Sequence, residues 1–470
     1  MSTINRNEFL KTAALGAALA IAICRLPVLE AAEVPPRPNI IFVLADDLGF
    51  ETLGCYGGVS YEGSAKHQAF GPVQTPNLDT LAKTGMRFGH CFCEPVCSPS
   101  RAEFITGQYN FHSGFVSIAG RYGSPHTLDE RAHPTVAASL KAAGYVTAIT
   151  GKWHLGKWDG LDKAVQEKTQ GIPATPDVDT DFPHIRACGF DRQFVFSGSR
   201  LEEYGPPTPA GYVPARFHNW ALRFLDSRKG KSEPFFLYYP SPIPHVPLMP
   251  TPLNPDQKEQ GNINFPSAVR YLDWQVGDLI RKLEEIGARE NTLLIFSGDN
   301  GTCNISTKMR DGSTVVGGKA TMLDTGSWVP MIASWPAKMT AGSVYDGLVQ
   351  FPDLMPTFLE LAGAKLPAGL DGISFAAQLQ GKPGTPREWV HVLHASEVEK
   401  KAGKKKKSDK PDVKISYFVR DATWKLRENG ELYDMSRSPY TEALVKPEND
   451  TFESKAARER LQAVLRKLHP

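Results

Sequence analysis

The sequence predicts a three-layer α/β fold with a mostly parallel central sheet, followed by a small C-terminal α+β domain with an antiparallel sheet. Short apolar runs, typical of strands buried on both faces, alternate with segments of helical period. Beyond Pro383 this alternation gives way to short strands separated by turns. A chain of 470 residues is also too long for one simple core. We therefore expect a large domain over residues 33–385 and a smaller one over residues 386–470.

The first 32 residues have the proportions of a secretory signal peptide. Arg6 and Lys11 precede an apolar run over residues 13–24, and small residues surround the cleavage expected near Ala32. The run is too short and too rich in alanine for a stable membrane span. A twin-arginine export signal would need a second arginine, so the export route stays open, and a frayed amphipathic leader is the alternative. We expect an exported protein, periplasmic or secreted.

The elements of the large domain follow from uninterrupted apolar runs for strands and from apolar stripes for helices. Strands are predicted over residues 39–45, 86–93, 145–150, 234–239, 292–296 and 331–335. Helices are predicted at 77–82, 99–106, 134–143, 217–225, 267–287 and 354–362. The 267–287 helix has the clearest stripe and closes at Gly287. Residues 57–74 and 157–214 are rich in Gly, Pro or polar residues and are expected to be dominated by loops.

The C-terminal segment has the signals of a small antiparallel sheet. Short strands are predicted over residues 417–419, 424–426 and 431–433, and an amphipathic helix over residues 456–468. The lysine-rich run from Lys400 to Lys414 is expected to be a solvated loop.

The composition narrows the classes of partner. A formal net charge of +2 gives no reason to expect nucleic acid or a membrane surface as a partner. Seven cysteines are too few for a disulfide framework in a chain of this size, and no paired cluster forms a zinc site. Export would permit one or two disulfides, whose pairing stays open.

The stretch from Cys97 to Arg101 has the signals of a helix start. Ser98 is a good N-cap, Pro99 suits the first helical position, and Glu103 is expected near the positive end of the helix dipole. Free backbone N–H groups there would favour an anion and lower the pKa of the Cys97 thiol. Arg101, one turn further, is expected to point its donors at the same spot. The alternative is a buried small residue before an ordinary helix; a Cys-x5-Arg phosphatase loop is excluded, because Glu103 occupies the sixth position.

Four predicted strands end in ionisable or metal-binding side chains. The residues concerned are Asp46 and Asp47, Lys152 with His154, His245, and Asp299 with Asn300. Ligands of open parallel sheets bind beyond the carboxyl ends of the strands, so we expect these groups to converge. Taken one at a time, each is an ordinary capped turn or solvated loop residue. Together, the hard oxygens of the Asp and Asn side chains suit Ca2+ or Mg2+ and not zinc.

Positive groups surround this predicted cation site. They are Arg101, Lys152, Lys319, His154 and His245. Three carboxylates with one divalent cation leave a charge of about −1, which the added cations outweigh, so the site is expected to attract an anionic substrate. Such side chains serve as electrostatic clamps or proton donors.

These motifs resemble those of the type I sulfatases, the formylglycine-dependent, arylsulfatase-like enzymes of the alkaline phosphatase superfamily. The resemblance extends from Arg37 to Asp434. It rests on five motifs in the family's order: Ala45-Asp46-Asp47, Cys97-Ser98-Pro99-Ser100-Arg101 with Thr106-Gly107, Gly151-Lys152-Trp153-His154-Leu155-Gly156, Pro244-His245 and Asp299-Asn300-Gly301. The resemblance implies an alkaline-phosphatase-like fold.

The resemblance also implies a nucleophile and a cofactor. A formylglycine-generating enzyme would convert Cys97 to Cα-formylglycine, which is hydrated to a gem-diol. One hydroxyl would attack the ester sulfur, and loss of a proton from the other, with help from His154, would expel sulfate. Asp46, Asp47, Asp299 and Asn300 would hold Ca2+ together with the modified residue 97.

The resemblance assigns roles to the basic residues as well. Arg101 and Lys152 would orient the modified side chain and bind sulfate, while His245 and Lys319 would stabilise sulfate and the leaving oxygen. The stretch after Lys319 departs from the family, because Thr325 and Trp328 replace a Gly and an Arg.

The resulting prediction is an exported sulfuric ester hydrolase that acts on an aryl or, in preference, a carbohydrate sulfate. One alternative is a phosphonate monoester hydrolase or phosphodiesterase of the same superfamily. The other is a non-catalytic protein that binds sulfated glycans.

Overall fold

The computed structural model describes residues 37–62, 71–156, 181–196, 211–258, 261–398 and 412–469, together with residues 179, 198 and 208. The predicted signal peptide, the lysine-rich run and much of the 157–214 segment therefore lie outside the described residues.

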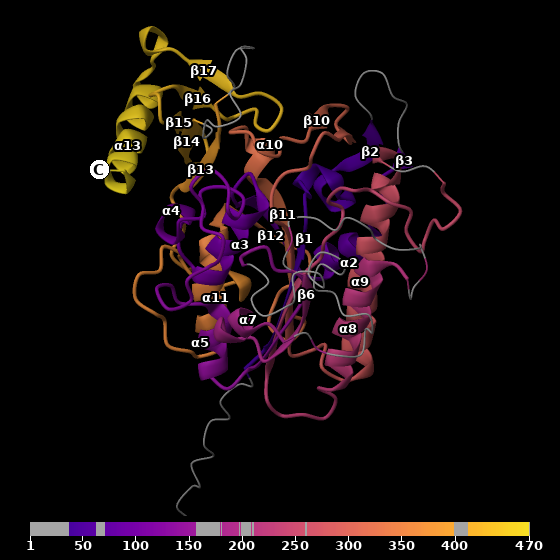
Figure 1. Ribbon diagram of the computed structural model, residues 1–470. Helices are drawn as coiled ribbons and strands as arrows, with labels where there is room; N and C mark the ends of the chain where they lie inside the picture. Colours follow the sequence, from indigo (N-terminus) through magenta and orange to yellow (C-terminus); the bar gives the residue numbers. More distant parts are fainter. Residues whose placement is uncertain are drawn as a thin grey trace, which may run out of the picture. The chain divides into compact units, whose positions relative to one another are not determined.

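An eight-stranded sheet forms the centre of the large domain (Figure 1), in the order β12-β4-β11-β8-β1-β7-β5-β6. Its strands are β1 (Asn39–Ala45), β4 (Met86–Phe92), β5 (Val146–Lys152), β6 (Arg192–Phe196), β7 (Phe235–Pro240), β8 (Thr292–Gly298), β11 (Trp328–Ser334) and β12 (Ser343–Gln350). Neighbouring strands are parallel except where β11 pairs with β4 and β8. The predicted, mostly parallel sheet is confirmed.

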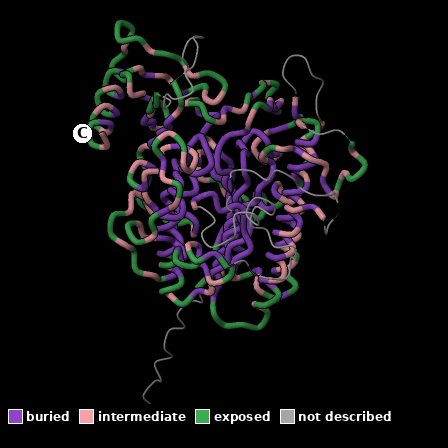
Figure 2. Tube along the Cα trace, in the orientation of Figure 1, coloured by how far each residue is buried: buried purple, intermediate pink, exposed green. Residues whose placement is uncertain are grey.

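Strand β1 shows why this sheet needs helices on both faces. Its alternate residues Ile40 and Phe42 belong to one buried core, while Ile41 and Val43 belong to the other. The first core includes residues of α3 (Cys97–Thr106), α5 (Val136–Ala142), α7 (Pro183–Ala187) and α11 (Leu354–Leu361). The second includes residues of α2 (Pro76–Thr84), α8 (Val213–Asp226) and α9 (Phe265–Glu285). These three layers are visible in Figure 1, and Figure 2 shows the sheet buried between them.

Shorter helices complete the large domain. The α-helices are α4 (Asn110–Ser113), α10 (Asp324–Ser327) and α12 (Ala376–Leu379). The 3-10 turns are η1 (Phe50–Thr52), η2 (Gly54–Tyr56), η3 (Asn262–Asn264) and η4 (Phe351–Asp353).

The C-terminal segment forms the predicted antiparallel sheet. The order is β13 (Val390–Glu397), β14 (Val413–Arg420), β15 (Trp424–Arg427), β16 (Leu432–Asp434) and β17 (Ala443–Val445). After η5 (Pro447–Asn449), helix α13 (Phe452–Leu468) packs Leu461 and Leu465 against Leu426 and Leu432 of the sheet. This helix starts four residues before the predicted one, because Thr451 caps it by accepting a hydrogen bond from Ser454 N.

Three features of the loops and connections were missed from the sequence. The segment 57–74, predicted as a loop, contains β2 (Gly58–Glu62) and β3 (Gly71–Pro72). With β9 (Ser306–Met309) and β10 (Thr314–Val316) they form a second sheet in the order β10-β9-β2-β3. The described part of 157–214 contains α7 and the edge strand β6. Strand β12 was not predicted, because its burial alternates along the other edge of the sheet. These strands are short or half-exposed, so their sequences lack the uninterrupted apolar run of a central strand.

Two further observations bear on membranes and disulfides. Within the described ranges, no helix combines the length and apolar character needed to cross a bilayer. The six described cysteines are all free thiols.

Candidate active site

The structure brings the predicted site residues together at the carboxyl ends of the central strands. Asp46 and Asp47 follow β1, Lys152 ends β5, and Asp299 and Asn300 follow β8, while His154 and His245 lie in the loops after β5 and β7. Cys97 and Arg101 lie in the first turn and a half of α3. The strands β5, β7, β1 and β8 are parallel neighbours, so their carboxyl ends lie on the same edge of the sheet.

The backbone turns sharply at three of these positions. Asp47, His154 and Ala320 have φ values of 66°, 58° and 63°, in the left-handed region that residues with a Cβ adopt rarely. Such conformations persist only where surrounding contacts enforce them, and they concentrate at functional sites. Here they turn the chain immediately beyond β1, β5 and Lys319.

The carboxylates fit a divalent cation. Asp46, Asp299 and Cys97 each offer a ligand atom, and these three atoms lie within 4.8 Å of one another. Among the described residues, Asp46 Oδ1 and Asn300 Oδ1 are buried without a hydrogen-bond partner. Asn300 Nδ2 donates to Asp47 Oδ1 at 2.8 Å, which leaves the Asn300 carbonyl oxygen for another ligand. Orphaned buried oxygens beside carboxylates are what a Ca2+ or Mg2+ site requires.

The two inner carboxylates have opposite pKa shifts. Burial raises the pKa of Asp46, but the charges of Lys152, His245 and Arg101 outweigh it and hold that pKa well below its usual range. Burial and the neighbouring Asp46 charge raise the pKa of Asp299 to about 7, despite the opposing effect of Arg101. One carboxylate is thus ionised at the expense of the other, and a cation between them would favour ionisation of both.

The guanidinium of Arg101 donates its hydrogen bonds to other groups of the protein. Its Nε and Nη2 donate to Asp299 Oδ2 at 3.0 and 2.7 Å, and its Nη1 donates to the Lys152 carbonyl at 2.6 Å. Its Nη2 also lies 3.6 Å from Asp46 Oδ1. The sequence predicts that Arg101 points its donors at the spot occupied by Cys97, and two of them bind Asp299, which offers a ligand atom within 4.8 Å of one on Cys97. The guanidinium also joins α3 to the end of β5.

Lys152 and Lys319 each form an ion pair with one of the two aspartates that follow β1. Lys152 Nζ donates to Asp46 Oδ2 at 2.6 Å, and Lys319 Nζ lies 2.5 Å from Asp47 Oδ1. His245 Nε2 lies 3.7 Å from Asp47 Oδ2. The structure thus brings Lys319 to the site even though the stretch that follows it departs from the family pattern.

His154 is buried beside these cations. Burial, followed by the charges of Lys152 and Arg101, holds the pKa of His154 well below its usual range. The imidazole is therefore neutral at pH 7, and its Nδ1 has no hydrogen-bond partner among the described residues. A neutral, partner-free ring nitrogen is suited to accept a proton.

The start of α3 differs from the prediction in two ways. The N-cap is Val96, so Ser98 lies inside the helix, where its Oγ donates to the His154 carbonyl and accepts from Ala119 N, both at 3.1 Å. Burial raises the pKa of the Cys97 thiol more than the neighbouring Lys152 and Lys319 lower it. The thiol is therefore not activated by the helix end, contrary to expectation.

Glu103 also differs from its predicted role. Instead of serving the positive end of the helix dipole, it is fully buried beside Glu94, and its Oε1 accepts from Asn110 N at 3.4 Å. Burial raises the pKa of Glu94 to about 8, and burial together with the charge of Glu94 holds the pKa of Glu103 well above its usual range. Two like charges cannot both remain ionised there, so the pair holds a shared proton.

Trp328, which replaces the family's Arg, has become part of an aromatic stack. Its ring centroid lies 4.6 Å from that of Phe50 and 5.1 Å from that of His90, in stacked geometry. Its Nε1 donates to the Gly89 carbonyl at 3.1 Å. The substitution exchanges a charged side chain for an apolar one that fixes β11 to β4 beside the site.

Sequence reasoning missed a buried ion cluster that holds the turn after Lys319. Asp324, at the start of α10, pairs with Arg420 of β14 and with Lys425 of β15, whose Nζ lies 2.8 Å from Asp324 Oδ1. Glu442 accepts from Lys425 Nζ and from Asp324 N, each at 2.7 Å. The C-terminal sheet therefore anchors the turn that presents Lys319. The acidic residue five positions after Lys319 was the available signal, but its partners lie about a hundred residues away.

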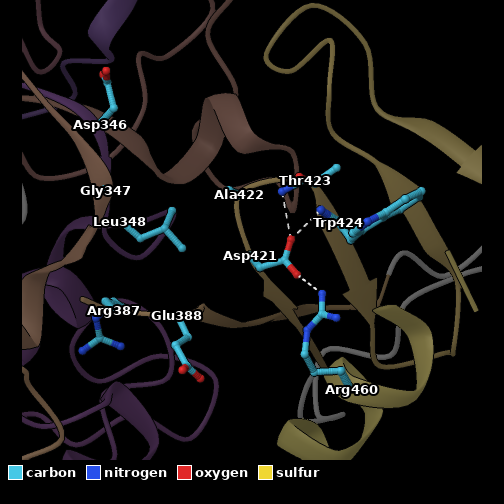
Figure 3. A pocket seen from close by; sticks show the side chains of 10 residues that line it. All are labelled: Asp346, Gly347, Leu348, Arg387, Glu388, Asp421, Ala422, Thr423, Trp424 and Arg460. Atoms are coloured by element: carbon cyan, nitrogen blue, oxygen red, sulfur yellow. Dashed lines mark hydrogen bonds and ion pairs between the residues drawn. The ribbon is translucent and has the colours of Figure 1, made fainter. Parts of the chain in front are cut away.

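A separate cavity of 330 Å³ lies beside the C-terminal sheet (Figure 3). Asp421 accepts hydrogen bonds there from Thr423 N and Trp424 N and pairs with Arg460. None of the predicted site residues lines this cavity. It is therefore not the site of the chemistry.

Comparison with known proteins agrees with this geometry. A family model of sulfatases matches residues 38–364, and a model described as the C-terminal part of N-sulphoglucosamine sulphohydrolase matches residues 317–468. The chain belongs to the sulfatase family. It is thus a sulfuric ester hydrolase, as the sequence predicts.

Curated relatives support the same assignment. Human (Homo sapiens) arylsulfatase A is 34% identical over 375 residues, which cover 75% of this chain and 69% of the relative. The N-acetylgalactosamine-6-sulfatase of Rattus norvegicus is 31% identical over 387 residues, which cover 76% of this chain and 69% of the relative.

Solved structures share the fold of this sulfatase. The crystal structure of Ps i-CgsB superposes with a TM-score of 0.69 at 24% identity and covers 92% of both chains. The structure of BT4656 in complex with its substrate D-glucosamine-2-N,6-O-disulfate superposes with a TM-score of 0.64 at 21% sequence identity, and the match covers 92% of this chain and 97% of that chain. A phosphonate monoester hydrolase from Silicibacter pomeroyi superposes with a TM-score of 0.60 at 18% sequence identity, and the match covers 91% of this chain and 95% of that chain. The fold alone therefore does not separate sulfate esters from phosphonates.

Proposed function

We propose that this sulfatase removes sulfate from a carbohydrate through a Cα-formylglycine made from Cys97, with Ca2+ or Mg2+ as its cation. The observation that carries the proposal is the position of Cys97, whose sulfur lies within 4.8 Å of carboxylate oxygens of Asp46 and Asp299. A side chain at this position, once oxidised to an aldehyde and hydrated, supplies an oxygen nucleophile. Maturation would then require a formylglycine-generating enzyme as a partner.

The proposed cation ligands are Asp46, Asp47, Asp299, Asn300 and the modified residue 97. When bound, the cation withdraws negative charge from the oxygens that it touches, which favours both an anionic substrate and an anionic nucleophile. Arg101 would hold the Asp299 carboxylate in place through its two donors to Oδ2.

The remaining polar residues would bind sulfate and move protons. Lys152, Lys319 and His245 surround the aspartates with donors that match the oxygens of a sulfate group. His154 Nδ1, neutral and without a described partner, would accept a proton from residue 97 when sulfate leaves. His245 or Lys319 would donate a proton to the leaving oxygen.

A carbohydrate sulfate is favoured over an aryl sulfate by the chemistry of the relatives. One relative is named an N-acetylgalactosamine-6-sulfatase, and one structural neighbour was solved with a disulfated glucosamine as its substrate. Another relative is named arylsulfatase A, so aryl sulfates are included among the test substrates. The segments 56–74 and 158–214 are proposed to shape the substrate pocket.

The remaining organisation is also a proposal. Residues 1–32 would direct export to the periplasm or beyond, residues 33–385 would form the catalytic domain, and residues 386–470 would form the C-terminal subdomain.

The test is sulfate release by protein co-produced with a formylglycine-generating enzyme. Matched aryl sulfate, aryl phosphonate and aryl phosphodiester substrates should rank with the sulfate first, and a panel of defined sulfated saccharides should contain a better substrate still. Cys97→Ala is the control and should release no sulfate. Faster turnover of the phosphonate or the phosphodiester than of the sulfate would overturn the proposed reaction, and a best substrate among the aryl sulfates would overturn the carbohydrate preference.

A further inference from the structure

Besides the two groups that contain Asp46, one more group of metal-type ligands occurs among the described residues. It consists of Glu130, His184 and Cys188, whose ligand atoms lie within 4.8 Å of one another. His184 Nε2 is 3.7 Å from Cys188 Sγ and 3.6 Å from Glu130 Oε2. Cys188 is fully buried, whereas the side chains of His184 and Glu130 are 10% and 21% exposed. The group is therefore largely enclosed by protein, with His184 and Glu130 partly exposed.

The local fold explains why these residues meet. His184 lies in α7, and Cys188 is the residue that caps the helix, with its N–H donating to the His184 carbonyl at 2.9 Å. Residues four apart lie on the same face of a helical turn. Glu130 comes from the segment before α5, where the Leu128 carbonyl lies 2.8 Å from His184 Nε2. Leu128 N in turn donates to the Leu155 carbonyl at 2.9 Å, so the group lies beside the loop that carries His154.

The donor set indicates the class of metal. A thiolate, an imidazole and a carboxylate are the ligands of zinc and suit Ca2+ poorly. Zn–S and Zn–N bonds of about 2.3 and 2.0 Å at tetrahedral angles separate the ligand atoms by about 3.5 Å. The measured separations from His184 Nε2, 3.6 and 3.7 Å, are close to this value. A hydrogen-bonded network without metal is the competing interpretation, since the Leu128 carbonyl already accepts from that nitrogen when it is protonated.

We infer that Glu130, His184 and Cys188 form a second, structural metal site that takes Zn2+ and braces the loop that carries His154. Binding displaces the thiol proton of Cys188. His184 ligates through Nε2 in the neutral tautomer that carries its single proton on Nδ1, an atom without a hydrogen-bond partner among the described residues. The fourth position is left to the Leu128 carbonyl or to water. Because the buried thiol must lose its proton, affinity for Zn2+ rises with pH.

The experiment measures zinc binding in the presence of excess Ca2+, which saturates the proposed catalytic cation site. It uses the full chain in a Cys97→Ser background, so that the thiol of the active site cannot contribute. A chelator first removes bound metal, and Ca2+ is then restored. Zn2+ is titrated against a competing dye, and the metal content of the protein is measured by inductively coupled plasma mass spectrometry. Co2+ replaces Zn2+ in a parallel titration, because a cobalt–thiolate bond gives a charge-transfer absorption band.

The expected result is one tightly bound Zn2+ per chain and a higher Tm in its presence. Cys188→Ser and Glu130→Gln should each weaken binding at least tenfold, and Cys188→Ser should abolish the cobalt–thiolate band. Cys55→Ser, which changes a half-buried thiol elsewhere, is the matched control and should bind as the parent does. Glu130→Gln keeps the inference testable if Cys188→Ser fails to fold, since Glu130 is partly exposed. No bound Zn2+, or binding unchanged by these substitutions, would overturn the inference and leave a hydrogen-bonded network only.

Discussion

The substitution Asp324→Asn tests whether the C-terminal sheet holds the turn that presents Lys319. Asp324 forms ion pairs with the buried Arg420 and Lys425, and all three side chains are at most 2% exposed. The amide would leave two buried cations facing the single carboxylate of Glu442. Removing one partner from a buried ion pair costs about 3–5 kcal/mol, because the remaining charge stays buried and uncompensated. We expect a loss of that size in the free energy of unfolding.

The measurement is equilibrium unfolding in urea, with the midpoint and the slope compared between variants. Asp181→Asn is the matched control, because the pair of Asp181 with Arg186 is exposed on both sides and should contribute about 0–1 kcal/mol. At temperatures where the variant stays folded, kcat/KM for a sulfate ester should also fall, since Lys425 holds the turn by donating to the Met322 carbonyl at 3.2 Å. A midpoint shift no larger than that of Asp181→Asn would refute the reasoning.

Three other predictions concern Cys97 and its surroundings. Cys97→Ala should abolish sulfate release without changing the far-ultraviolet circular dichroism, and chelation of the wild-type protein should lower activity until Ca2+ or Mg2+ is restored; activity unaffected by both treatments would contradict the proposed site. Ser98→Ala removes two hydrogen bonds, one of them to the loop of His154, and should destabilise the protein by about 1–3 kcal/mol and lower kcat while residue 97 is still converted; unchanged stability and kcat would argue against this support. The pKa of Glu94 is about 8 in the folded protein and about 4.5 in an exposed chain. Between these two pH values the folded protein keeps a proton that the unfolded chain releases, so the free energy of unfolding should fall as pH rises from about 4.5 to 8. Glu94→Gln should flatten this fall, measured as Tm against pH, and an identical profile for the variant would show that the carboxyl pair with Glu103 is not its source.

Much of the fold was predictable because central strands carry a simple signal. The apolar run of β1 ends in Asp46 and Asp47, and that of β8 ends in Asp299. Once the sheet was taken as parallel, the convergence of these ends followed from topology alone. The resemblance to sulfatases then supplied the proposed roles, which geometry supports by placing Cys97 among the carboxylates.

The remaining features depend on contacts between distant segments. The second sheet joins β2 to β9, which lie more than 240 residues apart in the chain, and neither strand has a long apolar run. The partners of Asp324 come from the C-terminal sheet, and the helix-end argument for Cys97 failed because it omitted the cost of burial. In each case the deciding quantity was burial or a long-range partner, and a local sequence window contains neither.

The most direct measurement of the central claim is the mass of the tryptic peptide that ends at Arg101 and contains residue 97. The peptide would be taken from protein co-produced with a formylglycine-generating enzyme and treated with an alkylating agent that marks thiols. We predict an aldehyde at residue 97, beside alkylated Cys91 and Cys93, and a rate of sulfate release proportional to the converted fraction. Full activity in protein whose Cys97 is entirely an alkylatable thiol would contradict the account.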